Sequence, residues 1–312
     1  MKIAKKALLS ILALVLLFWV GCAVYAYWPT AEKSARSFAR AGDRFVQVDG
    51  LALCYRPYHR QPHPGKRPIV LLHGFAGSLY SFRKLAPLLA ETRDVYAFDL
   101  PGFGLSDKPV DHDYRAAGQA RVVSGFLSAL KLNDVAVAGH SMGGPIAMHA
   151  AITDPRITRL VFLDAGIIDN GVPVFVEYMV FPFPRFAARM FAGERFRRRM
   201  LEKSFHDPRL VTDDLVNSYL EMASTEGFMD GWTAMMKQYS SAPELPFVKQ
   251  IRVPTLLVWG AFDRSNPPAN AERIHGDLPG STLVVVPEAG HYVHEEQPAA
   301  VAQAIERFLS PR

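Results

Sequence analysis

One ten-residue stretch, from Val135 to Gly144, constrains the fold more than any other part of the chain. Its first residues, Val-Ala-Val-Ala, form a short apolar run that is typical of a strand buried on both faces. The residues that follow read Gly-His-Ser-Met-Gly-Gly, and the segment from Pro145 onward favours a helix. A buried strand that runs directly into a helix predicts an α/β fold, with a mostly parallel sheet and helices on both of its faces.

The turn between this strand and this helix carries Ser141 at its corner. The flanking glycines, Gly139 and Gly143, have no Cβ atom to clash where the chain changes direction. Ser141 is therefore expected to be exposed at the carboxyl end of the sheet, a position typical of a nucleophilic serine in a G-x-S-x-G turn. A free serine hydroxyl is a weak nucleophile. It needs a base, an acid that orients the base, and donors for an oxyanion.

The Gly-His-Ser-Met-Gly-Gly run at residues 139–144 resembles the α/β-hydrolase family, and within it the esterase, lipase and monoacylglycerol lipase branches. The resemblance implies triad residues in the chain order serine, acid, histidine. Asp263 follows an apolar strand in a Gly-x-x-Asp segment, and His291 follows the last strand in a Gly-His pair. The predicted triad is Ser141, Asp263 and His291, with His291 as the base that Asp263 orients.

The same resemblance implies the donors of the oxyanion hole. Residues 69–72 are an apolar strand that leads into His73-Gly74-Phe75, a loop that supplies one backbone N–H in this family. The residue after the nucleophile supplies the other. The predicted donors are the backbone N–H groups of Phe75 and Met142, although an ordinary tight turn is the alternative for His73-Gly74.

Some of these roles have rivals elsewhere in the sequence. Asp164 also follows an apolar strand and competes for the role of the acid. His294 and His140 compete for the role of the base, but the side chain of His140 is expected to point away from the turn. Asp99 ends a further strand, and it is expected to organise its loop rather than to take part in chemistry.

The alternation of strands and helices stops between about Gly166 and Val253, where the pattern predicts helices only. The resemblance implies a helical cap over residues 166–253, inserted into a core of residues 44–165 and 254–312. Most Met and aromatic side chains of the cap are expected to pack against the core, and a minority to line a pocket. Cations alternate with large apolar residues from Arg185 to Phe205, which suits either a bilayer surface or a solvated helix face.

The N-terminus holds an uncharged run of 25 residues, from Ala7 to Ala31, after three lysines. A helix needs about 20 apolar residues to cross a bilayer, and the aromatic end at Tyr25 to Trp28 suits the membrane interface. Residues 1–31 are predicted to be an uncleaved single-pass anchor, with the catalytic body exported. Flanking positive charges do not decide the orientation. The alternatives are a cleaved signal peptide and a lipoprotein signal at Cys22.

Composition narrows the remaining classes. The chain has 312 residues, of which 49% are hydrophobic and 21% charged, as in a globular protein. A net charge of +5 without a long Lys and Arg run argues against a nucleic-acid partner, while an anionic membrane surface stays possible. Two cysteines and no Cys/His cluster with ligand spacing predict no disulfide, no metal and no cofactor.

The anchor and the resemblance together predict a membrane-anchored serine hydrolase that cleaves esters of lipidic substrates, such as lysophospholipids, phospholipids or monoacylglycerols. A hydrolase of small non-lipid esters or of carbon–carbon bonds, and a non-catalytic binding protein with the same fold, are the alternatives. Gly21 and Ala23 in the anchor allow helix pairing, so a homodimer is possible.

Overall fold

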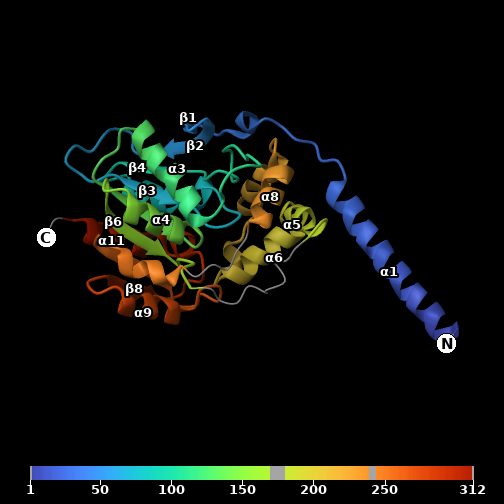
Figure 1. Cartoon of the computed structure of the whole chain (residues 1–312). Coiled ribbons are helices and arrows are strands. Elements are labelled where there is room, and N and C mark those ends of the chain that lie inside the picture. Colours follow the sequence, from blue (N-terminus) through green and yellow to red (C-terminus); the bar gives the residue numbers. More distant parts are fainter. Residues whose placement is uncertain (1, 169–179, 239–243, 311–312) are drawn as a thin grey trace.

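An eight-stranded sheet forms the centre of the protein in the computed structural model, which describes residues 2–168, 180–238 and 244–310 (Figure 1). The strand order is β1-β2-β4-β3-β5-β6-β7-β8. The hairpin of β1 (Arg44–Val48) and β2 (Leu51–Pro57) is antiparallel, and β2 is antiparallel to β4. Every other neighbouring pair is parallel, which confirms the predicted sheet.

The remaining strands are β3 (Ile69–Leu72), β4 (Val95–Phe98), β5 (Val135–His140), β6 (Ile157–Leu163), β7 (Thr255–Gly260) and β8 (Thr282–Val286). Every residue of β3, β5 and β7 is buried, which explains their continuously apolar sequences. Successive side chains of a strand point to opposite faces. Val70 accordingly belongs to one hydrophobic cluster and Leu71 to another.

Each cluster is completed by helices on its own side of the sheet. On the Val70 side pack α3 (Ala116–Ala129), α4 (Gly143–Thr153) and α9 (Pro268–Asp277). On the Leu71 side pack α2 (Leu85–Leu89), α10 (Val293–Glu296) and α11 (Pro298–Leu309). The predicted arrangement, with helices on both faces of the sheet, is therefore present.

Among the described residues between β6 and β7, the α-helices are α5 (Phe183–Phe191), α6 (Glu194–Ser204), α7 (Asp213–Glu221) and α8 (Phe228–Lys237). In Figure 1, α5, α6 and α8 stand together beside the sheet, on the side nearer to α1. The described part of the predicted cap, 166–253, holds helices and turns but no strand. Two pieces of it, residues 169–179 and 239–243, lie outside the described residues.

The first helix, α1 (Lys2–Tyr27), extends away from the body of the molecule, with its N-terminal end farthest out (Figure 1). Residues Ile3–Tyr27 are long and apolar enough to cross a membrane, as an anchor or a signal sequence does. Near its C-terminal end, α1 meets α5 and the residues before it. Rings stack edge-on or tilted between Trp19 and Phe181, and between Tyr25 and Phe186. We call this the anchor contact.

Two arginines of α5 complete the anchor contact. The Arg185 guanidinium lies 4.7 Å from the centre of the Tyr27 ring, and that of Arg189 lies 5.1 Å from the centre of the Tyr25 ring. Arg189 also donates a hydrogen bond to the carbonyl of Trp28, at 2.5 Å. Such cation–ring contacts stabilise by about 0.5–1 kcal/mol each at exposed sites. We call the described residues 180–238 and 244–253 the cap segment. The C-terminal end of the apolar helix is thus fixed to the cap segment rather than to the sheet.

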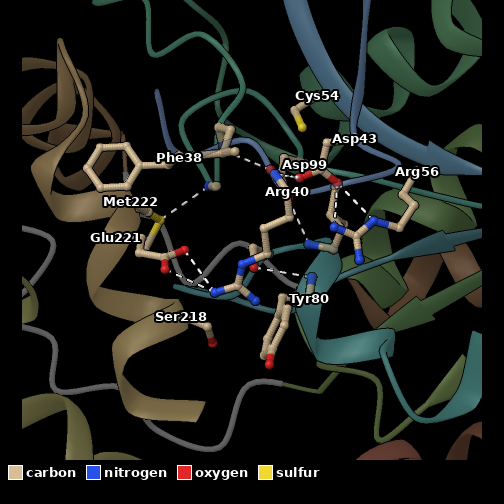
Figure 2. Close-up of a pocket in the computed structure, with 14 residues that line it drawn as sticks. Phe38, Arg40, Asp43, Cys54, Arg56, Tyr80, Asp99, Ser218, Glu221 and Met222 are labelled. Atoms are coloured by element: carbon tan, nitrogen blue, oxygen red, sulfur yellow. Dashed lines mark hydrogen bonds and ion pairs between the residues drawn. The ribbon is translucent and has the colours of Figure 1, made fainter. Parts of the chain in front are cut away.

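Residues 32–43, which we call the strap, connect α1 to β1 across the cap. The backbone of Lys33 pairs with the cap, donating to Ser224 and accepting from Glu226 at 2.8 and 3.0 Å. Farther along, the Arg40 side chain donates two hydrogen bonds to the Glu221 carboxylate, at 3.0 and 3.1 Å (Figure 2). Asp43 then accepts from the Arg56 side chain of β2, at 2.9 Å. The strap therefore joins cap and core.

Figure 2 shows a pocket under the strap, between β2, the loop after β3 and the end of α7. Its cavity measures about 30 Å³, which is room for one or two water molecules. No triad residue lines it. This pocket is too small for an ester substrate, so it is not the candidate active site.

Candidate active site

The turn at Ser141 has the sharp geometry that the sequence predicts. Ser141 has a φ of +49°, which is uncommon for a residue with a side chain. Three backbone hydrogen bonds hold this conformation: its N–H donates to Leu163, at 3.0 Å, and its carbonyl accepts from Gly144 and Gly166, each at 2.9 Å. Strained backbone of this kind persists only where its surroundings determine it. Here strand β6 and the start of α4 do so.

The two flanking glycines are explained by close approach of the backbone. A Cβ atom on Gly139 would lie 2.1 Å from the carbonyl oxygen of Gly143. A Cβ on Gly143 would lie 2.5 Å from the carbonyl oxygen of Leu72 in β3. Neither position has room for a side chain, so the turn can form only with glycine on both sides of the serine.

The three predicted triad residues are connected by hydrogen bonds. Nε2 of His291 lies 2.9 Å from Oγ of Ser141, and Nδ1 of His291 lies 2.8 Å from Oδ2 of Asp263. The other Asp263 oxygen accepts from the backbone N–H groups of Ser265 and Asn266. Because an ionised Asp263 requires the proton on Nδ1, Nε2 is left free to accept the serine proton. The arrangement suits nucleophilic catalysis.

The loop that carries His291 is held from two sides. Its backbone N–H donates to the carbonyl of Ser204, the last residue of α6, at 2.8 Å. Its carbonyl accepts from Nε2 of His140, at 2.7 Å. A Cβ on Gly290 would lie 2.5 Å from the Ser204 oxygen, which explains the glycine before the histidine. The candidate base is thus positioned by both the core and the cap segment.

Asp164, the rival acid, has a different role. It is completely buried, and its two oxygens accept from the backbone N–H groups of Gly260 and Val293, at 2.8 and 3.0 Å. These residues belong to the segments that carry Asp263 and His291. Burial, and then the nearby Asp263, hold the pKa of Asp164 well above its ordinary value. Asp164 therefore ties the two segments together, and Asp263 is the carboxylate on His291.

Neither rival histidine is bound to the Ser141 hydroxyl in the described chain. His140 uses Nε2 on the His291 carbonyl, and burial, with His294 and His291 nearby, holds its pKa well below the ordinary value. His294 is completely buried, with its ring 5.0 Å from that of Phe82. Burial lowers the pKa of His294 to about 3. Both rings are therefore neutral near pH 7.

The candidate oxyanion donors lie beside the nucleophile. A Cβ on Gly74 would be 3.1 Å from the Cβ of Ser141, so the loop after β3 touches the turn at the serine. In the described residues the backbone N–H groups of Phe75 and Met142 have no hydrogen-bond acceptor. Two unpaired donors next to a serine suit a developing oxyanion. Their role in catalysis remains a prediction.

His73, at the start of this loop, has a structural role that its sequence did not disclose. Its Nδ1 donates to the Gly74 carbonyl at 2.8 Å, and its Nε2 accepts from the Leu100 N–H at 3.1 Å. Burial lowers the pKa of His73 to about 4. A neutral imidazole with one donor and one acceptor satisfies both partners. His73 therefore fixes the loop to the segment after β4.

Asp99 organises its own loop, as the sequence predicts. Its carboxylate accepts from the backbone N–H groups of Leu79 and Leu105, at 2.6 and 2.7 Å. It is 1% exposed, and burial raises its pKa to about 6. The two bonds join the loops after β3 and β4 at a distance from the triad hydrogen bonds.

The pattern from Arg185 to Phe205 predicts that its basic residues lie at a lipid or water surface. This prediction is wrong for Arg197, which is 0% exposed. Its neighbours Arg195 and Arg199 are exposed, so the rest of that surface stays basic. The i, i+4 spacing of Arg197 with Leu201, which is also buried, was the one available sign that it lies on the inner face of α6.

The turn at Ser141 and its hydrogen-bonded partners are features of a serine hydrolase. Residues 67–298, well over half of the chain, match the alpha/beta hydrolase fold family, and the chain belongs to this family. The fold, the turn at Ser141 and the order of the three hydrogen-bonded residues all agree with that membership.

Similar proteins include hydrolases of different kinds. Uncharacterized hydrolase YugF of Bacillus subtilis (strain 168) is 31% identical over 268 residues, 85% of this chain and 97% of that protein. A 2-hydroxy-6-oxononadienedioate/2-hydroxy-6-oxononatrienedioate hydrolase of Cupriavidus pinatubonensis (strain JMP 134 / LMG 1197) is 27% identical, over 89% of this chain and 99% of its own. The crystal structure of a membrane phospholipase A is 26% identical, with a TM-score of 0.70 and coverage of 99% and 98%. Because these similar proteins are hydrolases of different kinds, membership of the family does not fix the type of bond that this protein cleaves.

Proposed function

We propose that this protein is a membrane-anchored serine hydrolase that cleaves carboxylic esters of lipidic substrates. The observation that carries the proposal is the hydrogen-bonded series Asp263–His291–Ser141 beside two unpaired backbone N–H groups. A serine with this set of partners supports acyl transfer. A non-catalytic binding protein would have no need for all of these parts in register.

The residues would act in the following order. His291 takes the proton of Ser141 as Oγ attacks the ester carbonyl, and the N–H groups of Phe75 and Met142 receive the resulting oxyanion. The tetrahedral intermediate collapses to an acyl-enzyme, and His291 gives its proton to the departing alcohol. Water, deprotonated by His291, then attacks the acyl carbonyl. The bond to Oγ breaks, His291 returns the proton to Ser141, and the acid is released. Asp263 stabilises the imidazolium in both halves of the reaction.

Support for a lipidic substrate comes from the N-terminal helix. The similarity to a membrane phospholipase A covers 99% of this chain and therefore includes the N-terminal segment. The helix Ile3–Tyr27 has the length of a membrane span. The anchor contact fixes its inner end to α5, so an inserted helix would hold the cap segment at the bilayer surface with the body outside.

The exposed cations of α6 add to this orientation. Arg195 and Arg199 are exposed on the helix that follows α5, and each cation near an anionic surface contributes about 1 kcal/mol. We infer that the mouth of the cap faces lipid and admits acyl chains to Ser141. In the rival arrangement these arginines form a solvated helix face, and the substrate arrives from water.

A second candidate function is hydrolysis of carbon–carbon bonds. It is favoured by the 27% identity to a 2-hydroxy-6-oxononadienedioate/2-hydroxy-6-oxononatrienedioate hydrolase over 89% of this chain. The same three residues would be required, so the triad does not separate the two candidates. Substrate profiling does.

The proposal is tested in two stages on the full chain in detergent. Labelling by a fluorophosphonate probe should occur in the native protein and be lost in Ser141→Ala, because the probe reports an activated serine. Rates are then compared for phosphatidylcholine, lysophosphatidylcholine, a monoacylglycerol, a short p-nitrophenyl ester and a 2-hydroxy-6-oxo-dienoate. Faster turnover of the dienoate than of every ester would reject the lipid proposal in favour of the second candidate. An unlabelled native protein would reject both.

A further inference from the structure

Arg197 is a completely buried cation at the boundary between the cap segment and the core. It belongs to α6, and its Nη1 donates to the carbonyl of Ala76 at 2.8 Å. Its Nη2 donates to the carbonyl of Phe191 at 2.9 Å. One hydrogen bond therefore crosses to the loop after β3, and the other stays within the cap segment.

The surroundings of Arg197 are aromatic rather than acidic. The guanidinium carbon lies about 6 Å or less from the ring centres of Phe191, Tyr219 and Trp232, at 5.7, 5.8 and 6.0 Å. No carboxylate in the described chain lies within ion-pair distance of it. Burial lowers the pKa of Arg197 to about 10, which leaves it protonated at neutral pH. By contrast, Arg83, which is also largely buried, pairs with Glu295 at 2.6 Å.

A buried charge without an acidic partner is costly, so its position calls for a specific explanation. The residue that it binds belongs to the turn Gly74–Gly77, which carries the candidate donor Phe75. The Gly74 carbonyl accepts from the Gly77 N–H at 3.0 Å, and it also accepts from His73 at 2.8 Å. Ala76 has a φ of +57°, an uncommon conformation for alanine. The core thus holds one end of this turn.

Arg197 is the contact that holds the other end. The Phe75 ring packs against Phe191 and Trp232, which also surround the guanidinium, at ring distances of 5.3 and 5.4 Å. Without the bond from Arg197, the Ala76 carbonyl would lose this hydrogen-bond donor at a position whose backbone is already strained. The Ala76 carbonyl shares a peptide group with the Gly77 N–H, which donates to the Gly74 carbonyl. The Gly74 carbonyl in turn shares a peptide group with the Phe75 N–H. The bond from Arg197 therefore bears on the orientation of the Phe75 N–H through the Gly77 to Gly74 hydrogen bond.

We propose that Arg197 is a positioning residue of the active site, which reaches down from the cap to fix the turn that presents the Phe75 N–H to the oxyanion. The inference rests on the proposed serine hydrolase function. It assigns to the cap a part in stabilising the transition state, in addition to any part in binding substrate. A cap displaced from the core would leave this oxyanion donor unfixed.

The test compares Arg197→Met with Lys203→Met, a substitution of an exposed cation in the same helix, and turnover is measured on a soluble short-chain ester. Loss of one direct oxyanion donor lowers kcat by about 100- to 1,000-fold. A misplaced donor should have a smaller effect, and we expect Arg197→Met to lower kcat by about 10- to 100-fold. KM should change by less than about threefold, since the ground state uses this donor little. Lys203→Met should match the native enzyme.

Two further measurements separate positioning from a structural role. The affinity for a trifluoromethyl ketone, which forms a tetrahedral adduct on serine, should fall by the same factor as kcat. The affinity for a non-hydrolysable ether analogue should not change. Arg197→Lys keeps the charge and one donor, so it should retain more kcat than Arg197→Met. If Arg197→Met does not fold, Arg197→Lys decides, with an expected loss of about 3- to 10-fold in kcat.

The outcomes distinguish this inference from the function on which it rests. If the native protein reacts with a fluorophosphonate and Arg197→Met reacts at the same rate, the positioning role is rejected and the serine hydrolase stands. A change confined to KM also rejects it, and so does an unchanged kcat in a folded Arg197→Lys where Arg197→Met does not fold. A native protein that reacts with neither ester nor probe rejects the proposed function itself.

Discussion

The turn at Ser141 and the anchor contact are two well-defined regions that rest on different kinds of interaction. At the turn, backbone meets backbone: Gly139 and Gly143 have no room for a Cβ, and three main-chain hydrogen bonds hold the serine. At the anchor contact, side chains meet side chains, through rings and the Arg185 and Arg189 guanidinium groups. Close backbone contacts allow only certain residue types at a position, whereas a contact between side chains can be made by several combinations of residues. The first region should therefore fail abruptly on mutation, and the second gradually.

The largest expected effect is at the turn itself. Ser141→Ala and His291→Ala should each lower ester hydrolysis by about 10⁴-fold or more, because each removes a member of a unit that acts together. Turnover is measured with a short soluble ester, and thermal unfolding shows that the fold is intact. Residual activity above a few per cent in folded Ser141→Ala would mean that another residue is the nucleophile.

The two aspartates sharpen the comparison within the core. Asp263→Asn should lower kcat by about 10⁴-fold by favouring the wrong tautomer of His291. Asp164→Asn leaves one backbone N–H without an acceptor, and it should lower the free energy of unfolding by about 1–3 kcal/mol with a smaller loss of activity. Turnover and urea denaturation are measured on both variants. The reverse order of activities would transfer the acid role to Asp164.

Acid should destabilise the core rather than the anchor contact. The pKa values of His73 and His294 are lowered by burial to about 4 and about 3. Below the ordinary histidine pKa near 6.5 the unfolded chain binds protons that the folded chain does not, so stability is full above that pH and is lost on acidification. Between the unfolded and folded pKa values, each buried histidine lowers the free energy of unfolding by roughly 1 kcal/mol for each pH unit of acidification. His294→Phe should flatten this dependence in urea denaturation; an unchanged slope contradicts the assignment.

Removal of residues 1–28 tests the anchor contact directly. The truncated protein should hydrolyse a soluble short ester normally, because no triad partner is lost. On phospholipid vesicles its rate should fall by about tenfold, through loss of membrane attachment. Neutralising Arg195 and Arg199 should lower the rate further on anionic vesicles only.

The full chain should also sediment with membranes after salt and alkali washes. Equal vesicle rates for the two proteins would end the case for lipid delivery through the cap.

The smallest effect is expected at the strap. The Arg40 and Glu221 side chains are about one-third exposed, at 32% and 35%, which weakens their ion pair. A double-mutant cycle with Arg40→Ala and Glu221→Ala should give a coupling energy of about 0.5–1 kcal/mol in urea denaturation. A coupling near zero would mean that this ion pair does not help to hold the strap on the cap segment.

The same contrast explains what the sequence could predict. Short sequence patterns predict the strands, the turn and the positions proposed for the triad, because buried parallel strands and tight turns accept few residue types. Asp263 was preferred to Asp164 as the acid only through a family resemblance, because both residues follow buried strands, and the hydrogen bond to His291 is made by Asp263. The burial of Arg197 and the bonds of the strap depend on which surfaces meet in the folded chain. No local pattern at Arg40 or Glu221 announces a partner 181 residues away.

The attachment of α1 to α5 also decides which part of the molecule is stationary. If the helix is embedded in a bilayer, the cap segment is held at the bilayer surface and the α/β core is attached to the membrane only through the cap segment and the strap. If the contacts between the cap segment and the core weakened, the core would move away from the membrane while the cap segment stayed at the lipid surface. In a bilayer, the cap segment would then be the fixed part of the protein and the α/β core the part free to move.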